Sequence, residues 1–192
     1  MINKECLVSK LRDVYLIESL NILKRSFPEV LSGMSSTISA VYCDKAFLSN
    51  SDIKGIKNDI NEGIEGAIKI IKNFPLNYVE NLCKTSLGND YNKLSNLDKV
   101  EDVTTDAIIS FRLNNITVEN FISNYENTFL STLEDIIPDF QRMCMMEVMS
   151  KSSMGLFDVS KIPIRSIIID SLRNSNEYRT YIDKVKKIAQ NK

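Results

Sequence analysis

The chain has 192 residues, of which 43% are hydrophobic and 26% charged, and its formal net charge is −1. This composition is that of an ordinary globular protein, and the length predicts a single helical domain, residues 1–192, that needs no disulfide or metal for stability. No run reaches the roughly twenty apolar residues of a membrane span, and the charged N-terminal residues leave no room for the apolar segment of a secretory signal. We therefore expect a cytoplasmic protein with no membrane partner.

Two shortages of residue types exclude much catalytic chemistry. The chain has no histidine, which removes Ser-His-Asp and Cys-His nucleophiles and the HExxH zinc motif. Its six glycines form neither GxGxxG nor a P-loop, so a phosphate-binding loop is unsupported. The four cysteines are isolated in sequence, and we expect them to be reduced thiols rather than disulfides or zinc ligands; they are Cys6, Cys43, Cys83 and Cys144.

Carboxylate-only metal chemistry survives this exclusion. Glu62 and Glu65 lie three residues apart on an expected helix, and Asp98 and Glu101 repeat the spacing. Such pairs can hold Mg²⁺ between helices, because this cation needs only oxygen ligands. The favoured alternative is a solvated helix face, so we expect no metal and no cofactor. The question of an enzyme stays open, with the balance of the sequence against one.

The N-terminal part of the chain predicts two helices. Apolar residues at helical spacing indicate a first helix near residues 4–25. Ser26 to Glu29 reads as a capping box with Pro28 in the first turn of a second helix. Gly33 lies on a side of small residues that a neighbouring helix can approach. The segment "TISAVYC" has β-branched character and is the alternative strand, but helix is favoured.

The middle of the chain carries the clearest helical pattern. Isoleucines repeat at helical spacing over about twenty residues from Asp52. Gly55, Gly63 and Gly66 interrupt this helix at a cost of about 1 kcal/mol each relative to alanine, and we expect them to allow close packing of another helix. Pro75 predicts the start of a shorter helix that Gly88 ends as a C-cap. The polar residues 88–99 are expected to be a flexible loop.

The C-terminal half predicts further helices. Asn114-Asn115 permits a β-hairpin, but we favour a helix that ends there and a second that begins at Thr117, with Ile116 and Phe121 as a hydrophobic staple. Pro138 must kink or end that second helix. A C-terminal helical hairpin is expected over residues 161–190. The fold class is therefore all-α, an irregular bundle of about seven to eight helices with one kinked at Pro138.

One segment, "RMCMMEVMSKSSM" at residues 142–154, contains five of the seven methionines. Met143, Met146 and Met149 lie at i, i+3 and i+6 and share a helix face, with Cys144 to one side. Thioethers and a thiolate suit Cu(I), but such sites are usually supported by histidine or a second cysteine, and neither lies nearby. We therefore predict no soft-metal site.

Two interpretations of the methionine segment remain. In the first, an adaptable surface binds apolar partners inside a polar rim; its residues would be Met143, Met145, Met146, Met149, Arg142 and Glu147. In the second, the methionines fill a core left irregular by Pro138 and continue the stripe from Ile137 and Phe140. The core interpretation is favoured because apolar stripes usually mean burial. A mixture of the two would leave Met145 exposed.

Charge is unevenly distributed along the chain. Residues 100–147 contain nine acidic side chains and two arginines, whereas residues 161–192 contain eight bases and three acids. The two regions can compensate each other if they lie close together. Alternatively, the last two helices have the outline of a helix-turn-helix that meets phosphates; its bases would be Arg179, Lys184, Lys186 and Lys187.

These patterns favour a non-catalytic helical protein that acts by binding another protein, as an adaptor, a chaperone-like partner, an inhibitor or an immunity-type factor. The partner is another protein or a second copy of this chain. The alternative is a regulator that binds nucleic acid through the basic C-terminal helix pair.

Overall fold

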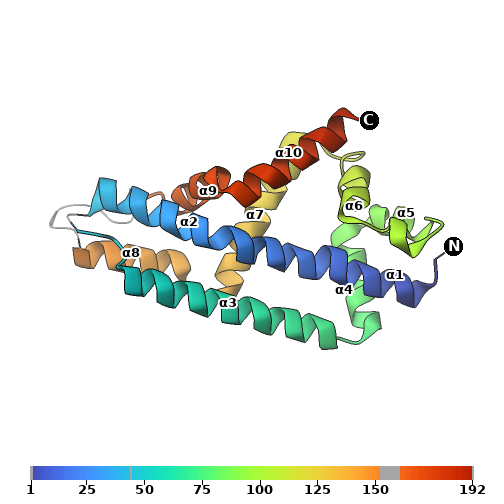
Figure 1. The fold of residues 1–192 in the computed structure, drawn as a ribbon, viewed down its shortest axis with the longest axis horizontal. Coiled ribbons are helices and arrows are strands. Elements are labelled where there is room, and N and C mark those ends of the chain that lie inside the picture. Colours follow the sequence, from blue (N-terminus) through green and yellow to red (C-terminus); the bar gives the residue numbers. More distant parts are fainter. Residues whose placement is uncertain (1, 44, 152–160, 192) are drawn as a thin grey trace. The chain divides into compact units, whose positions relative to one another are not determined.

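A computed structural model describes residues 2–43, 45–151 and 161–191, and within these ranges the chain is helical and contains no strand, which confirms the all-α prediction. Figure 1 shows the helices in chain order. Their bounds are α1 Lys4–Leu11, the π-helical turn η1 Arg12–Ile17, α2 Glu18–Tyr42, α3 Asn50–Asn73, α4 Leu76–Leu87, α5 Asn89–Ser95, the short 3-10 helix η2 Val100–Asp102, α6 Thr105–Arg112, α7 Val118–Ile136, α8 Phe140–Lys151, α9 Ile164–Asn174 and α10 Asn176–Gln190.

The helices contribute to two compact units. Unit 1 comprises Met1–Ile22, Ile64–Asn124 and Tyr181–Lys192, and unit 2 comprises Leu23–Gly63 and Tyr125–Thr180. The boundaries fall inside α2, α3, α7 and α10, so each of these helices contributes residues to both units.

Two groups of buried apolar residues can be described in unit 1 from the residues that the structure places. In the larger group, Leu7 and Leu11 of α1 pack with Val79 and Cys83 of α4 and with Leu94 of α5. The smaller group joins three helices, because Ile109 of α6, Phe121 of α7 and Val185 of α10 are buried together. Both groups follow the apolar stripe of each helix, as amphipathic helices require.

Unit 2 is held by close contacts between α2 and its neighbours. The Phe27 ring lies edge-on to Phe140 of α8, with 6.3 Å between ring centroids. A Cβ atom on Gly33 would lie 3.3 Å from the Ser171 side chain of α9, so α2 and α9 approach closely at this glycine, as the sequence predicts. The Glu29 carboxylate accepts a 2.7 Å hydrogen bond from the backbone N–H of Asn176, the first residue of α10.

The predicted helix start at Ser26 is wrong. α2 runs without interruption from Glu18 to Tyr42, with Pro28 in its interior and Ser26 fully buried. Pro28 costs the helix one backbone hydrogen bond. Burial of residues on both sides of it, such as Phe27 and Leu31, offsets this loss. Glu29, expected to cap this helix, caps α10 instead.

The other predicted helix ends agree more closely with the structure. Gly88 ends α4 with φ of 55°, a conformation that favours glycine. As favoured for Asn114-Asn115, one helix ends and another begins here, since α6 ends at Arg112 and α7 begins at Val118. The Thr117 hydroxyl accepts from the N–H of Asn120. Residues 88–99, expected to be a loop, carry the helix α5, because Tyr91 and Leu94 insert into the core of unit 1.

At Pro138 the chain breaks rather than bends. α7 ends at Ile136 and α8 begins at Phe140, and Asp139 between them has φ of 61°. Proline cannot donate the hydrogen bond needed to continue α7, and a left-handed residue ends the helical path. The break gives α8 a new direction and a new rotational setting, which decide which of its side chains are buried.

Candidate protein-binding surface on helix α8

Three side chains at i, i+4 and i+8 fix the inward side of α8. Phe140, Cys144 and Val148 are buried within unit 2, and they lie within one narrow stripe of the helix. Phe140 is anchored against Phe27, as described above. The exposure of every other residue of α8 depends on its position around the helix relative to this buried stripe.

Met143, Met146 and Met149 are 51%, 62% and 64% exposed, and together they are termed the methionine face. Each residue of an α-helix turns by about 100°, so the centre of this face lies about 200° from the centre of the buried stripe. The favoured core interpretation is therefore wrong for these three residues. They do not continue the stripe of Ile137 and Phe140, because each step of three residues along the helix moves the side chain about 60° further from Phe140, and this drift reaches about half a turn at Met149.

The other residues proposed for this surface lie on and around the methionine face. Arg142 falls between the methionines and is exposed, and its guanidinium pairs with Asp139 at 3.2 Å. Met145 is partly buried on the flank, so it is not the exposed residue that the mixed interpretation expected. Glu147 is also partly buried and flanks the methionine face near Met143. The face therefore has charged neighbours, as a binding surface with a polar rim requires.

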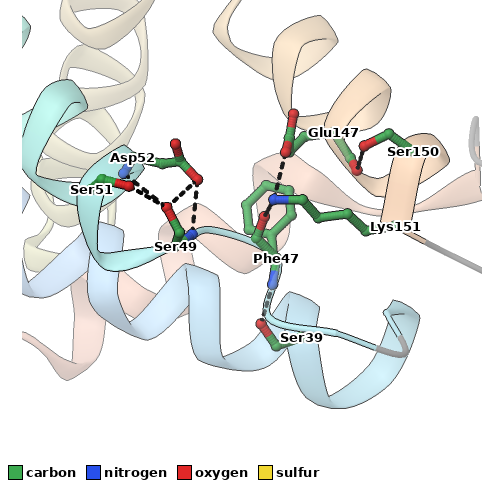
Figure 2. A network of polar contacts seen from close by, with 8 residues as sticks. All are labelled: Ser39, Phe47, Ser49, Ser51, Asp52, Glu147, Ser150 and Lys151. Carbon is green, nitrogen blue, oxygen red and sulfur yellow. Dashed lines mark hydrogen bonds and ion pairs between the residues drawn. The ribbon is translucent and has the colours of Figure 1, made fainter.

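The C-terminal end of α8 is tied to the segment between α2 and α3 (Figure 2). The Lys151 ammonium donates to the backbone carbonyl of Phe47 at 2.8 Å and pairs with Glu147 at 2.6 Å. Phe47 is fully buried, and its N–H donates to the Ser39 hydroxyl at 2.8 Å. These contacts hold the last turn of α8 and thus the orientation of Met149. The sequence does not indicate them, since residues 47 and 151 are far apart in the chain.

The same segment leads directly into α3. The Ser49 hydroxyl accepts from the N–H of Asp52, and the Asp52 carboxylate accepts from the N–H of Ser49 at 2.9 Å (Figure 2). This reciprocal pair is a capping box, and it starts the helix slightly before the predicted position at Asp52. Hydrogen bonds from Ser49 lower the pKa of Asp52 below its ordinary value.

A soft-metal site at the methionines fits this geometry poorly. Cys144 belongs to the buried stripe, on the side of α8 opposite the methionine face. Burial raises the pKa of the Cys144 thiol to about 12, so the thiolate that would bind a metal is disfavoured. Burial likewise raises the pKa of Cys83 to about 11. All four cysteines are free thiols.

The basic residues proposed for the C-terminal surface belong to both units, since Arg179 lies in unit 2 and the three lysines Lys184, Lys186 and Lys187 lie in unit 1. Arg179 of α10 donates hydrogen bonds to the side chain of Asn174 and to the backbone carbonyl of Arg173, both at the end of α9. Lys184 pairs with Asp106 of α6 in unit 1. Lys186 and Lys187 are exposed, and no ion pair to them occurs within residues 2–43, 45–151 and 161–191. At about 100° per residue, Lys186 and Lys187 lie about 100° and 200° from the buried Val185 around α10.

The predicted charge compensation is present in both units. Besides Lys184 and Asp106 in unit 1, Arg173 of α9 forms two hydrogen bonds to Glu126 of α7 in unit 2. Acidic residues of the central region thus pair with C-terminal bases. The carboxylate pairs considered for Mg²⁺, Glu62 with Glu65 and Asp98 with Glu101, are exposed, and no group of three or more potential metal ligands occurs in the part of the chain that the structure describes.

Among the described residues, no helix combines the length and the apolar character needed to cross a membrane. Comparisons with protein-family models, with curated proteins and with solved structures find no match to this chain.

Proposed function

We propose that this protein acts by binding another protein through the methionine face of α8. The observation that carries the proposal is the exposure of Met143, Met146 and Met149 in one line on a helix whose opposite side is anchored in a core. Single exposed apolar residues are ordinary, but several in a row on a rigid element are typical of an interaction site.

Methionine is well suited to such a surface. Its side chain is unbranched and polarizable, so it adapts to apolar partners of different shape. Each methionine that passes from about half exposed to buried would contribute about 1 kcal/mol of apolar burial. The partner is therefore a protein with an apolar patch. The charges of Arg142 and Glu147 would favour a partner with complementary charges around that patch. The absence of histidine and of phosphate-binding motifs supports a binding role over a catalytic one.

Exposure of the methionine face in solution is tested first. Brief treatment of the folded protein with dilute peroxide should oxidise Met143, Met146 and Met149 rapidly, as read by mass spectrometry. Met34 is 1% exposed and serves as the internal control that should stay reduced until the protein unfolds. Protection of all three methionines in a protein shown to be monomeric would contradict the proposal.

Binding is tested with paired variants. Met146→Asp and Met149→Asp place a charge on the face and should abolish capture of the partner while leaving the helical circular dichroism signal unchanged. Ile70→Asp is the matched control, because Ile70 is an equally exposed apolar residue on α3, at 57%. A partner held equally by all variants would refute this surface. Loss of a dimer of the pure protein in Met146→Asp would identify the partner as a second copy.

A further inference from the structure

Unit 1 contains a cavity of about 360 Å³ where the end of α4 and the start of α5 meet the turn between α6 and α7. Its lining includes the charged residues Asp90 and Arg112, the amide of Asn115, and the apolar side chains of Leu87 and Ile116. The volume lies in the range of about 300–1,000 Å³ that small-molecule sites occupy. Nothing in the proposed protein-binding function uses this cavity.

Asp90 is a buried carboxylate with only part of its hydrogen-bonding capacity used. Its side chain is 8% exposed. The Oδ1 atom accepts from Lys93 Nζ and from Asn115 Nδ2, each at 2.9 Å. Within the described ranges no group donates to the Oδ2 atom. An ionised carboxylate accepts about four hydrogen bonds, so Asp90 retains capacity for a ligand N–H or O–H.

Arg112 presents the complementary group. Its backbone carbonyl accepts from the N–H groups of Asn115 and Ile116, which fixes the residue at the end of α6. The side chain is partly buried, yet the guanidinium forms no hydrogen bond or ion pair with any residue that the structure describes. A guanidinium removed from bulk water without a partner is costly, and its planar donors match a carboxylate.

We propose that this cavity binds a small carboxylate that also carries an N–H or O–H donor, such as an aliphatic α-amino acid or α-hydroxy acid. Arg112 receives the ligand carboxylate, and Asp90 Oδ2 accepts from the ligand donor. Leu87 and Ile116 cover a short hydrocarbon side chain. Lys93 already balances the charge of Asp90, so the carboxylate of the ligand balances Arg112.

The probes are chosen to separate these contacts. L-leucine and 2-hydroxy-4-methylpentanoate carry both groups, 4-methylpentanoate lacks the donor, and L-leucinamide lacks the carboxylate. We expect the first or second compound to bind the full chain with a Kd of about 0.1 to 5 mM by calorimetry and to shift the amide resonances of Arg112 and Asn115. The other two should bind at least about tenfold more weakly.

Variants assign the contacts to residues. Arg112→Gln should weaken binding at least about tenfold, and Asp90→Asn should do the same. Arg165→Gln removes the same charge from unit 2 and should leave binding unchanged. Asp90→Asn can also disturb Lys93, whereas the Arg112 guanidinium has no hydrogen bond or ion pair to a described residue to lose, so Arg112→Gln decides the outcome if Asp90→Asn does not fold. Absence of binding by both bifunctional probes at about 20 mM, or equal binding of 4-methylpentanoate or leucinamide, would overturn the proposal.

Discussion

Glu126 shows how a single buried charge organises unit 2. Its carboxylate accepts from Arg173 Nε and Nη2 at 2.8 and 3.0 Å and from the Tyr178 hydroxyl at 2.6 Å. Burial by itself raises the pKa of Glu126, but the hydrogen bonds from Arg173 and Tyr178 outweigh it, and the pKa lies below its ordinary value of 4.5. One residue thus joins α7, α9 and α10.

Replacement of this carboxylate is expected to destabilise the protein. Glu126→Gln keeps the size of the side chain but leaves Arg173 without its counter-charge, and we expect a loss of about 1–3 kcal/mol in the free energy of unfolding. Urea denaturation measures it. Glu62→Gln, at an exposed position of α3, is the control and should change stability by less than about 0.5 kcal/mol. An equal effect of both substitutions would argue against the network.

The same residue predicts a pH dependence. Because the pKa of Glu126 is lower in the folded state, the unfolded chain binds more protons near pH 4.5, and stability falls as the pH drops through and below that value. Above the ordinary pKa this contribution is fully present. The free energy of unfolding, measured by urea denaturation at a series of pH values from 7 to 3, should therefore fall less steeply for Glu126→Gln than for the wild type. An equal fall in both proteins would contradict the lowered pKa.

At the scale of elements, the three glycines of α3 have different roles. The sequence predicted that all three allow close packing, but only Gly63 has a close neighbour, since a Cβ atom there would lie 2.8 Å from Ile136 Cγ2 of α7. A Cβ on Gly55 or Gly66 would meet nothing within 4 Å. Spacing alone does not distinguish these positions, because it does not say which face of α3 another helix covers.

Alanine substitutions separate these glycines. Gly66→Ala should stabilise the protein by about 0.5–1 kcal/mol through helix propensity. Gly63→Ala has the same propensity gain, but its Cβ overlaps a branched side chain, and overpacking costs about 1–3 kcal/mol. We therefore expect Gly63→Ala to be less stable than Gly66→Ala by at least about 1 kcal/mol in thermal or urea unfolding. Equal stabilisation would mean that α7 does not pack at Gly63.

At the scale of the whole molecule, we expect the charge distribution to weaken nucleic-acid binding. The net charge is −1, and Lys184 and Arg173 pair with acidic residues of the central region. Phosphate binding depends on several bases that face the same strand. Lys186 and Lys187 are exposed, and two lysines supply few of the phosphate contacts that such binding needs.

A duplex-binding assay tests this alternative. We expect no saturable binding of a duplex of about 20 base pairs at about 150 mM salt, and no difference between the wild type and the triple variant Lys184→Gln, Lys186→Gln, Lys187→Gln. Fluorescence anisotropy over a salt series measures both. Binding that weakens steeply with salt and disappears in the triple variant would support the basic C-terminal surface instead of the methionine face.

The sequence by itself determined the all-α fold class and several helix ends. Gly88 and Thr117 mark helix ends because caps depend on a few neighbouring residues. The hairpin expected over residues 161–190 is helical as α9 and α10, and Tyr178, Ile182 and Val185 of α10 are buried at helical spacing. These features are local, and periodicity and capping carry local information.

The tertiary structure alone decided the features on which the two proposals rest. Pro28 lies inside α2, and the methionine face points away from the core, because residues distant in sequence determine which helical arrangement buries the most apolar surface. The cavity beside Arg112 and Asp90 forms for the same reason, since the turn after α6 and the start of α5 meet only in the folded unit. The sequence lists the side chains that can bind a partner, but packing selects those that remain exposed.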